Sequence, residues 1–269
     1  MGKILIVCVN YNSYEDLSLY LQSINEAAKC LDVHTNKIDV YIADNSSQKK
    51  DIDLNFEYLF VKVFSLDNLG YLGGAFNVIN STQNIKNYDY VFITNVDIVF
   101  SGNLLKNLFN NTYAEDIAWI APSIYSEYEQ RDKNPQKLYR YKKRDLSLLL
   151  LMYKIPCLMH FYSNTLYKRK KYLPPLKKIS SCSIYSGHGS AIILTSVFFN
   201  NIKDLHYGSF LFGEEIYLAE LIRLAGLRVI YEPNLLFYDK EHTSISKLPS
   251  KTIYSYHVES LRYLLKKFY

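Results

Sequence analysis

Apolar residues in the first half of the chain form short runs, and longer amphipathic stretches separate these runs. Short apolar runs that end in polar residues predict buried strands. Residues 14–29 place apolar side chains such as Leu17 and Leu21 at helical spacing, which predicts an amphipathic helix. The strands predicted in this half cover residues 4–9, 39–43, 58–65 and 90–94.

This alternation of strands and helices predicts an α/β fold with a mostly parallel sheet flanked by helices. Such sheets bind ligands beyond the carboxyl ends of their strands. Asn10, Asp44 and Asp97 follow three of the predicted strands, and a glycine-rich loop over residues 67–74 follows another. Asp97 offers a hard oxygen ligand at the end of an apolar strand, so these residues together indicate a metal and nucleotide site.

Residues 123–180 interrupt the alternation. Basic clusters at residues 142–144 and 168–171 flank an apolar and aromatic stretch, and Pro174 and Pro175 follow it. We interpret this segment as an insertion or lid. Basic residues around an apolar body suit contact with an anionic membrane surface, and a solvated basic loop over a small satellite core is the alternative.

Regular patterns return after residue 186. Glu214 and Glu215 follow Gly213 and occupy the first turn of a predicted helix that continues to residue 225. Carboxylates are favoured at this position by the helix macrodipole, so a structural role is the alternative to a chemical one. The other elements predicted here are strands at 191–194, 228–231 and 235–238, a helix at 196–201, and a basic amphipathic helix at 251–267.

Composition narrows the class of protein. The 269 residues are 49% hydrophobic, enough for the core of one α/β domain, and the net charge of +5 is too modest for a dedicated nucleic-acid binder. No apolar run reaches the roughly 20 residues of a membrane span, and the first run is too short for a signal peptide. The cysteines have no paired spacing, so neither a zinc site nor a disulfide framework is indicated. We expect a cytoplasmic protein, with peripheral attachment to the inner face of the cytoplasmic membrane left open.

A series of short motifs follows along the chain: Val9-Asn10-Tyr11-Asn12, Asp44-Asn45-Ser46-Ser47, Asn68 with Gly70, Tyr71, Gly74 and Asn77, Thr94-Asn95-Val96-Asp97, Ser186-Gly187, Gly213-Glu214-Glu215 and His242. In this order they resemble the family 2 glycosyltransferases, which have the GT-A fold. The resemblance covers the chain from about Lys3 to Ser246, apart from residues 123–180. Within the family, the similarity is greatest to bacterial transferases that build capsule, O-antigen and other surface polysaccharides, including a rhamnosyltransferase-like group.

The resemblance implies a UDP- or dTDP-sugar as donor. Asp44 matches the carboxylate that accepts a hydrogen bond from the pyrimidine ring, and Asn10 and Tyr11 match residues that enclose the base. Asp44 also suits an Asx-turn with Ser46, and the two roles are compatible. The other nucleotide-sugar-binding residues that the resemblance implies are Asn45, Asn68, Gly70, Gly74 and Asn95.

The resemblance also implies a divalent cation, Mn²⁺ or Mg²⁺. Transfer from a nucleotide sugar leaves negative charge on the departing diphosphate, which a cation can neutralise. Asp97 is the implied metal ligand, and His242 matches a histidine that helps to hold the metal or the diphosphate. The Asp-x-Asp motif of the family is Asn95-Val96-Asp97 here, so we expect Asn95 at the ribose or a phosphate.

The acidic pair is the implied catalytic group. An acceptor hydroxyl needs a base to attack at neutral pH, and Glu215 aligns with the base of the family, with Glu214 as the alternative. A base opposite the leaving diphosphate gives a single displacement with inversion at the anomeric carbon. The implied enzyme is an inverting hexosyltransferase that acts on a glycan, which we expect to be a lipid-linked oligosaccharide.

We expect one GT-A domain in four parts: a nucleotide-sugar-binding half (1–122), a variable insert or lid (123–180), an acceptor and catalytic half (181–248) and a carboxyl-terminal amphipathic helix (249–269). The alternatives are a nucleotidyltransferase-type nucleotide-binding protein, a non-catalytic protein with a decayed site, and a structural protein of the membrane surface. The first usually needs a basic phosphate-binding loop after the first strand, and residues 10–14 offer none.

Overall fold

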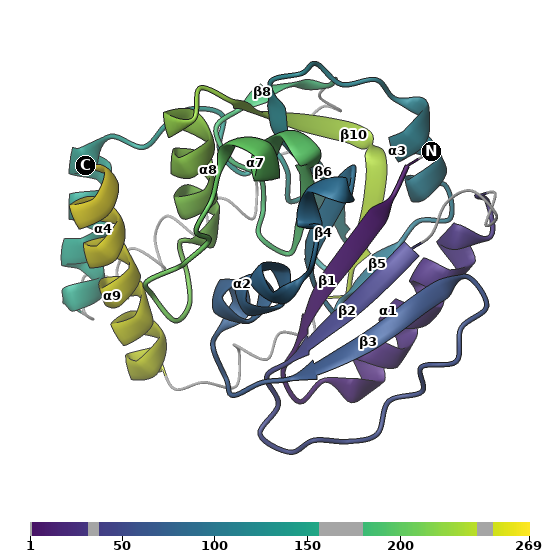
Figure 1. Cartoon of the computed structure of the whole chain (residues 1–269). Coiled ribbons are helices and arrows are strands. Elements are labelled where there is room, and N and C mark those ends of the chain that lie inside the picture. Colours follow the sequence, from purple (N-terminus) through teal and green to yellow (C-terminus); the bar gives the residue numbers. More distant parts are fainter. Residues whose placement is uncertain (1, 32–37, 156–179, 241–249) are drawn as a thin grey trace.

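The computed structural model describes residues 2–31, 38–155, 180–240 and 250–269. A mixed sheet lies at its centre, with the strand order β3-β2-β1-β4-β9-β6-β10-β5 (Figure 1). Two short strands extend it, β7 beside β6 and β8 beside β10. The strands are β1 (Ile4–Asn10), β2 (Ile38–Asp44), β3 (Leu59–Ser65), β4 (Tyr90–Asn95), β5 (Ile98–Phe100), β6 (Ile117–Ser126), β7 (Arg131–Asp132), β8 (Cys182–Ile184), β9 (Ala191–Thr195) and β10 (Arg228–Asp239).

Most of the long strands run in one direction. β1 to β4 form parallel pairs, and β6 and β10 share their direction because β9 is antiparallel to both β4 and β6. β5 is antiparallel to β10 at the far edge of the sheet. The described part of the chain therefore confirms the predicted fold class, a mostly parallel sheet flanked by helices.

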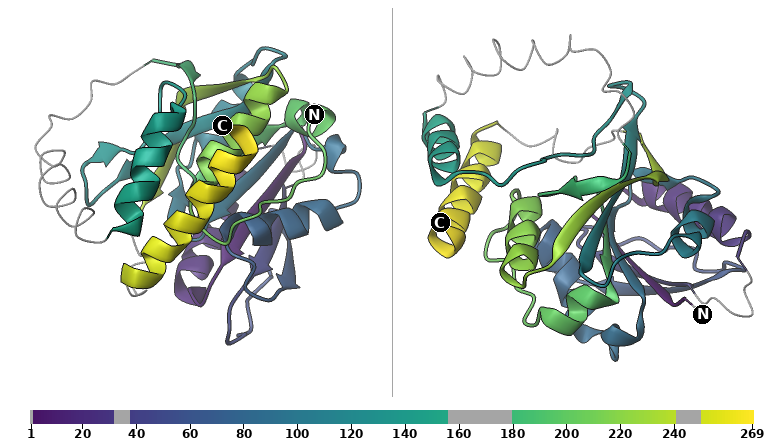
Figure 2. Two further views of the ribbon diagram at one scale, coloured as in Figure 1. Left: turned by 90° about the vertical axis from the view of Figure 1, so that its left-hand side faces the viewer. Right: turned by 90° about the horizontal axis from the view of Figure 1, so that it is seen from above.

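Helices cover both faces of this sheet. α1 and α3 pack on one face, and α2, α7 and α8 pack on the other. α4 and α9 lie side by side and form an outer layer next to α8 (Figure 2). The helices are α1 (Tyr14–Ala28), α2 (Tyr71–Ser81), η1 (Ile85–Asn87, a 3-10 turn), α3 (Leu104–Asn110), α4 (Lys143–Lys154), α7 (Ser196–Asn201), α8 (Glu214–Leu224) and α9 (Ser250–Phe268).

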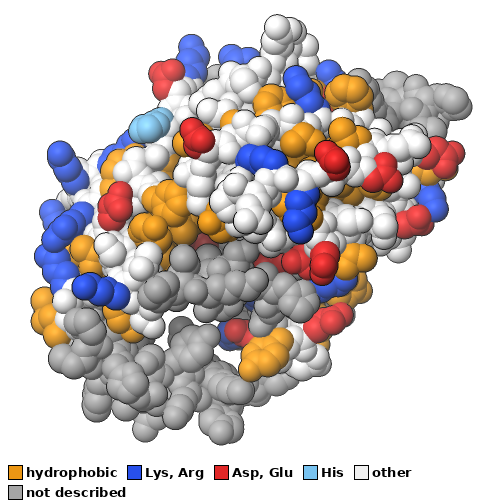
Figure 3. Space-filling view, turned by 90° about the horizontal axis from the view of Figure 1, so that it is seen from below, with side chains coloured by type: hydrophobic (Ala, Val, Ile, Leu, Met, Phe, Trp, Pro, Cys, Tyr) orange, Lys and Arg blue, Asp and Glu red, His pale blue; other side chains and the backbone are white. Residues whose placement is uncertain are grey.

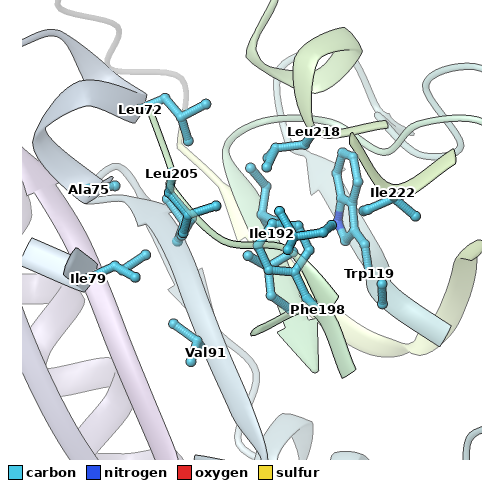
Figure 4. Packing of buried hydrophobic residues seen from close by; sticks show 14 of the residues in the cluster. Leu72, Ala75, Ile79, Val91, Trp119, Ile192, Phe198, Leu205, Leu218 and Ile222 are labelled. Atoms are coloured by element: carbon cyan, nitrogen blue, oxygen red, sulfur yellow. The ribbon is translucent and has the colours of Figure 1, made fainter. Parts of the chain in front are cut away.

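Each face of the sheet has its own hydrophobic core. On the face of α2, α7 and α8, Trp119 of β6 and Phe198 of α7 are fully buried and lie close to Leu218 and Ile222 of α8 (Figure 4). Full burial of a large apolar side chain contributes about 1.5–3 kcal/mol. This packing holds α8, whose first turn carries the two glutamates, firmly against the sheet.

The predicted elements of both halves agree with the structure to within about one residue at each end, with two exceptions. The glycine-rich loop predicted over residues 67–74 is shorter than predicted, because α2 begins at Tyr71. The chain forms one strand, β10, where the sequence predicted separate strands at 228–231 and 235–238, so that prediction was wrong. The ladder with β6 shifts its register between Glu232 and Leu236, and this irregularity takes up the extra residues without ending the strand.

The segment 123–180, predicted to be an insert or lid, contains regular structure in its described part. β6 continues to Ser126, β7 pairs with it, and α4 lies further along. The division of the chain into four parts stays a prediction. Residues 168–171 and His242 lie outside the described residues. Within the described ranges, no helix is long and apolar enough to cross a membrane.

Candidate active site

The parallel strands bring several predicted site residues to one edge of the sheet. Asn10, Asp44 and Asn95 are the last residues of β1, β2 and β4, and these strands are neighbours. Asp97 lies directly before β5, and Asp239 is the last residue of β10. Ligands of parallel sheets bind at this kind of edge, because the strands end there and the following loops diverge.

Asp97 and Asp239 form an acidic pair on neighbouring strands. Asp239 is paired with Ile98, and the Lys240 backbone N–H donates to the carbonyl oxygen of Asp97 at 3.1 Å. The Oδ1 atom of Asp97 is buried and has no hydrogen-bond partner within the described part of the chain. Burial, and then the charge of Asp239, raise the pKa of Asp97 to about 6. Asp239 therefore adds a second carboxylate to the one that the sequence singled out.

Lys133 brings a positive charge to the acidic pair. Its Nζ atom lies 2.7 Å from Oδ2 of Asp239, and the exposed fractions of the two side chains are 16% and 5%. Burial and Asp239 dominate the pKa of Asp97, and the charge of Lys133 opposes them. Lys133 follows β7, so the segment predicted as an insert or lid contributes a residue to this edge of the sheet.

The two glutamates at the start of α8 occupy different environments. Gly213 caps the helix with φ of +80°, a conformation that glycine adopts without strain. Glu214 points into the protein, and its burial together with the charge of Glu215 raises its pKa to about 8. The Glu215 carboxylate accepts hydrogen bonds from the Gly189 backbone N–H and the Gln136 side chain, both at 3.3 Å. Glu215 thus faces the loop before β9.

Tyr71 lies within the electrostatic influence of the two glutamates and of Asp97. The Tyr71 hydroxyl donates to the Gly189 carbonyl at 2.6 Å, and its pKa is raised by burial and by the charges of Glu214, Glu215 and Asp97. A group that responds to all three carboxylates lies within electrostatic reach of each of them. Tyr71 therefore marks one shared neighbourhood.

His188 occupies the same neighbourhood. Burial lowers its pKa, while the charges of Glu215 and Asp239 act in the opposite direction. Its Nδ1 atom lies 2.9 Å from the Ser190 hydroxyl, and its backbone N–H donates to the Asn134 side-chain oxygen at 2.8 Å. The histidine is held in place from both sides, next to residues of both acidic groups.

Asp44 sits in a network of internal hydrogen bonds. Its Oδ1 atom accepts from the Asn10 side chain at 3.0 Å and from the Ser46 hydroxyl at 2.6 Å. Its Oδ2 atom accepts from the Tyr14 hydroxyl at 2.9 Å, and the Lys49 ammonium lies 3.7 Å away. The contact with Ser46 is the turn interaction expected from the sequence. A carboxylate offers about four acceptor positions, and these contacts occupy them, so a further donor would have to replace Tyr14 or Lys49 at Oδ2.

The glycine-rich loop packs against Asn45. The Asn45 side chain donates to the Gly70 carbonyl at 2.8 Å, and a Cβ atom at Gly74 would lie 2.9 Å from its amide nitrogen. Asn68 accepts from the Gly70 backbone N–H at 3.2 Å. The structure therefore brings these four predicted residues together at the turn before α2 and in the first turn of that helix.

The remaining predicted residues are placed as follows. Tyr11 is 40% exposed in the loop after β1, where a ring is accessible for stacking on a base. The Asn95 backbone N–H donates to the Ser190 carbonyl at 3.0 Å, which joins the end of β4 to the start of β9. His242 lies outside the described residues. The described residues contain no group of three His, Cys, Asp or Glu side chains that could hold a metal ion.

The sequence interpretation missed Asp239, Lys133, Gln136 and His188. Asp239 ends an apolar strand, much as Asp97 follows one, so the same rule could have found it. Lys133 is one basic residue in a basic segment, and Gln136 is an ordinary polar residue after it. Neither carries a local signal, because only the long-range pairing of β6 and β10 brings their segment to this edge.

Comparison with solved structures defines the fold further. No protein-family model matches the chain, and no curated protein sequence matches it. The chain is similar to residues 1–349 of TarS from S. aureus, with a TM-score of 0.56 and 10% identity over 100% of this chain and 72% of that one. The fold is GT-A-like.

Two further TarS structures agree with this result. TarS 1-349 in complex with UDP-GlcNAc matches with a TM-score of 0.56 and 12% identity, over 93% of this chain and 62% of that one. A longer TarS structure matches with a TM-score of 0.52 and 11% identity, over 89% of this chain and 37% of that one. The likeness to TarS thus covers 89–100% of the chain in the three comparisons.

Proposed function

We propose that this chain is a glycosyltransferase that moves a sugar from a nucleoside diphosphate sugar to a glycan acceptor. The likeness to TarS, which has a structure in complex with UDP-GlcNAc, supports this proposal because it extends over 93% of the chain. Asp97 and Asp239 at the sheet edge and Glu215 at the start of α8 supply the carboxylates that such a transfer needs.

The donor in this proposal is a UDP- or dTDP-sugar, with UDP-sugars tested first. The base would lie near Asp44 and Tyr11, at the ends of β1 and β2. The N–H of a pyrimidine ring would take the place of Tyr14 or Lys49 at Oδ2 of Asp44, while the internal bonds to Asn10 and Ser46 hold the carboxylate in a fixed orientation. Direct stacking of the base on Tyr11 would complete the recognition.

A divalent cation suits the residues near the proposed diphosphate position. Carboxylate oxygens are the ligands that Mg²⁺ and Mn²⁺ favour, and the buried Oδ1 of Asp97 lacks any hydrogen-bond partner in the described ranges. Asp97 and Asp239 would hold the cation, with His242 as a further ligand implied by the family resemblance. Once bound, it would offset the negative charge that develops on the departing diphosphate.

Glu215 is the proposed general base. The acceptor hydroxyl attacks the anomeric carbon from the face opposite the diphosphate, Glu215 takes its proton, and the bond from that carbon to the diphosphate oxygen breaks, with inversion. Hydrogen bonds from Gly189 and Gln136 orient the carboxylate. The raised pKa of Glu214 keeps that neighbour protonated near pH 7, which favours Glu215 as the base.

The acceptor in this proposal is lipid-linked and lies at an anionic membrane surface. The outer layer of α4 and α9 carries much of the exposed basic charge, and Figure 3 shows basic side chains gathered along the left margin, the side of α4 and α9 in Figure 1. Each basic residue near an anionic surface contributes about 1 kcal/mol to binding. The exposed basic residues of these two helices include Lys143, Arg144, Lys154, Arg262, Lys266 and Lys267.

The test is a screen of nucleotide sugars by thermal unfolding in Mn²⁺, because a ligand that binds the native state raises its apparent stability. We expect a UDP- or dTDP-sugar to raise the unfolding temperature and to be consumed with a glycan acceptor. Glu215→Gln should abolish transfer and leave UDP binding unchanged, whereas Glu115→Gln, at an exposed position, should leave both unchanged. Full turnover by Glu215→Gln would rule out the assigned base, and no stabilisation by any nucleotide sugar would rule out the enzyme.

A further inference from the structure

Lys133 is a cation of the protein itself at the place where the proposed function puts a metal and a diphosphate. Its ammonium is ion-paired with Asp239 at 2.7 Å, and its charge acts on both Asp97 and His188. Only 16% of its side chain is exposed. A lysine that is this buried has either an electrostatic role or a packing role, and its neighbours show which of the two applies to Lys133.

The backbone around Lys133 is fixed by groups other than its own side chain. Its N–H donates to the Ile124 carbonyl at 2.8 Å. The neighbouring Asp132 carboxylate accepts from the Ser123 hydroxyl at 2.6 Å and from the Tyr231 hydroxyl at 2.7 Å. These contacts position the segment without the ion pair. The ammonium can therefore change partner while the backbone stays in place.

The net charge of Asp97, Asp239 and Lys133 determines whether this place attracts a diphosphate. Asp97, Asp239 and Lys133 together carry one net negative charge, which repels a diphosphate. A divalent cation on the two carboxylates would reverse that sign and leave one net positive charge. The same cation without Lys133 would leave no net charge, and the diphosphate would meet less attraction.

We propose that Lys133 competes with the divalent cation for Asp239 and binds a phosphate oxygen of the nucleotide once the cation and the diphosphate are both bound. The inference rests on the proposed function. Lys133 then acts in opposite directions on two ligands: it weakens binding of the cation alone and strengthens binding of the diphosphate with the cation. The cation displaces Lys133 from Asp239, and the displaced ammonium then binds the diphosphate. Binding of the cation and binding of the donor therefore favour each other.

A purely structural ion pair predicts something different. Loss of one partner of a buried pair leaves the other carboxylate uncompensated, so the fold would lose stability. A structural role gives no reason why loss of Lys133 would weaken nucleotide binding and also tighten metal binding. The opposite signs of the two effects therefore separate the proposal from a structural role.

The experiment measures two affinities for the wild type and for Lys133→Met. Mn²⁺ binding without nucleotide is followed by electron paramagnetic resonance, and UDP binding at saturating Mn²⁺ is followed by calorimetry. We expect Lys133→Met to bind Mn²⁺ several-fold more tightly and UDP about tenfold more weakly, the usual size of a lost charge-assisted hydrogen bond. Lys137→Met, which removes a nearby lysine whose ammonium lies over the Tyr141 ring, should change neither affinity.

A second variant guards against misfolding. Lys133→Gln keeps an N–H donor for Asp239 and removes the charge, so it should show the same two opposite shifts. Shifts of both affinities in one direction, or no shift in either variant, overturn the role of Lys133 while UDP binding by the wild type still supports the proposed function. Failure of the wild type to bind UDP with Mn²⁺ overturns the proposed function itself, and the inference with it.

Discussion

Arg140 donates to both oxygens of the buried Glu220 carboxylate, at 2.7 and 3.0 Å, and so ties the middle of α8 to the segment before α4. Arg223 and Tyr185 donate to the same carboxylate, at 3.0 and 2.8 Å. These contacts lower the pKa of Glu220 against the effect of burial. The buried Glu220 carboxylate therefore anchors α8, the helix that presents the catalytic glutamates in our proposal, to the segments around it.

Removal of Arg140 should destabilise the fold strongly. We expect Arg140→Met to lower the free energy of unfolding by about 1.5–3 kcal/mol, because the buried Glu220 carboxylate would lose two charge-assisted hydrogen bonds and keep those from Arg223 and Tyr185. The measurement is equilibrium unfolding in urea. The exposed pair of Arg228 and Asp116 is the control, and Asp116→Asn should cost much less stability, because solvent screens an exposed pair. An equal loss of unfolding free energy in the two variants would show that burial of Glu220 does not make its ion pair more important than an exposed one.

Glu214 should make the stability depend on pH. Its pKa is raised in the folded state from 4.5 to about 8, so the folded protein keeps a proton that the unfolded chain releases. The wild type should lose stability relative to Glu214→Gln as the pH rises from about 4.5 to 8, and the difference should stay constant above that range. Urea unfolding at about pH 4, 6 and 9, which lie below, within and above this range, measures it.

The control for this pH dependence is Glu115→Gln, at an exposed carboxylate far from the acidic pair in sequence. Its stability should follow the wild type across the same pH range. A Glu214→Gln protein that loses stability equally at every pH would show that Glu214 is ionised in the fold, contrary to the raised pKa.

Gly70 should be essential for the turn before α2. Its φ is +74°, and a Cβ atom there would lie 1.9 Å from the Phe210 carbonyl oxygen. We expect Gly70→Ala to cost about 1–3 kcal/mol of stability, from backbone strain and steric clash. Nothing lies within 4 Å of the corresponding position at Gly102, so Gly102→Ala should be nearly neutral. Thermal unfolding of the two variants is the comparison, and a neutral Gly70→Ala would mean that the loop can move away.

The α4 surface should contribute to membrane binding. Leu148, Leu151 and Ile155 are 57%, 48% and 37% exposed, and their spacing places them on one side of α4 and its end. We expect the double variant Leu148→Ser and Leu151→Ser to bind anionic vesicles less than the wild type in a sedimentation assay, with UDP binding unchanged. Lys86→Gln, an exposed basic residue elsewhere, is the control. Unchanged vesicle binding by the double variant would exclude this face.

The sequence sufficed for the elements whose patterns are local. Helix α1 and strands β1 to β4 show uninterrupted periodicity, and their ends follow from polar residues such as Asn10 and Asp44. The GT-A-like fold followed from the order of these elements and the family resemblance. The site residues proposed at strand ends also depended on this local logic, and their roles remain predictions.

What the sequence could not provide depends on long-range pairing. β5 has three residues and no period of its own, and it exists because β10 pairs with it from more than a hundred residues away. Lys133 reaches Asp239 for the same reason. Glu214 and Glu215 are adjacent in sequence, and only the packing of α8 assigns one to the interior and the other to the loop before β9.

The three-residue length of β5 has a practical consequence. The strand closes the end of the sheet, and within the described residues this brief ladder joins the backbone next to Asp97 to β10. Short terminal strands open more readily than central ones. A low concentration of denaturant should therefore abolish activity while circular dichroism still shows the native secondary structure.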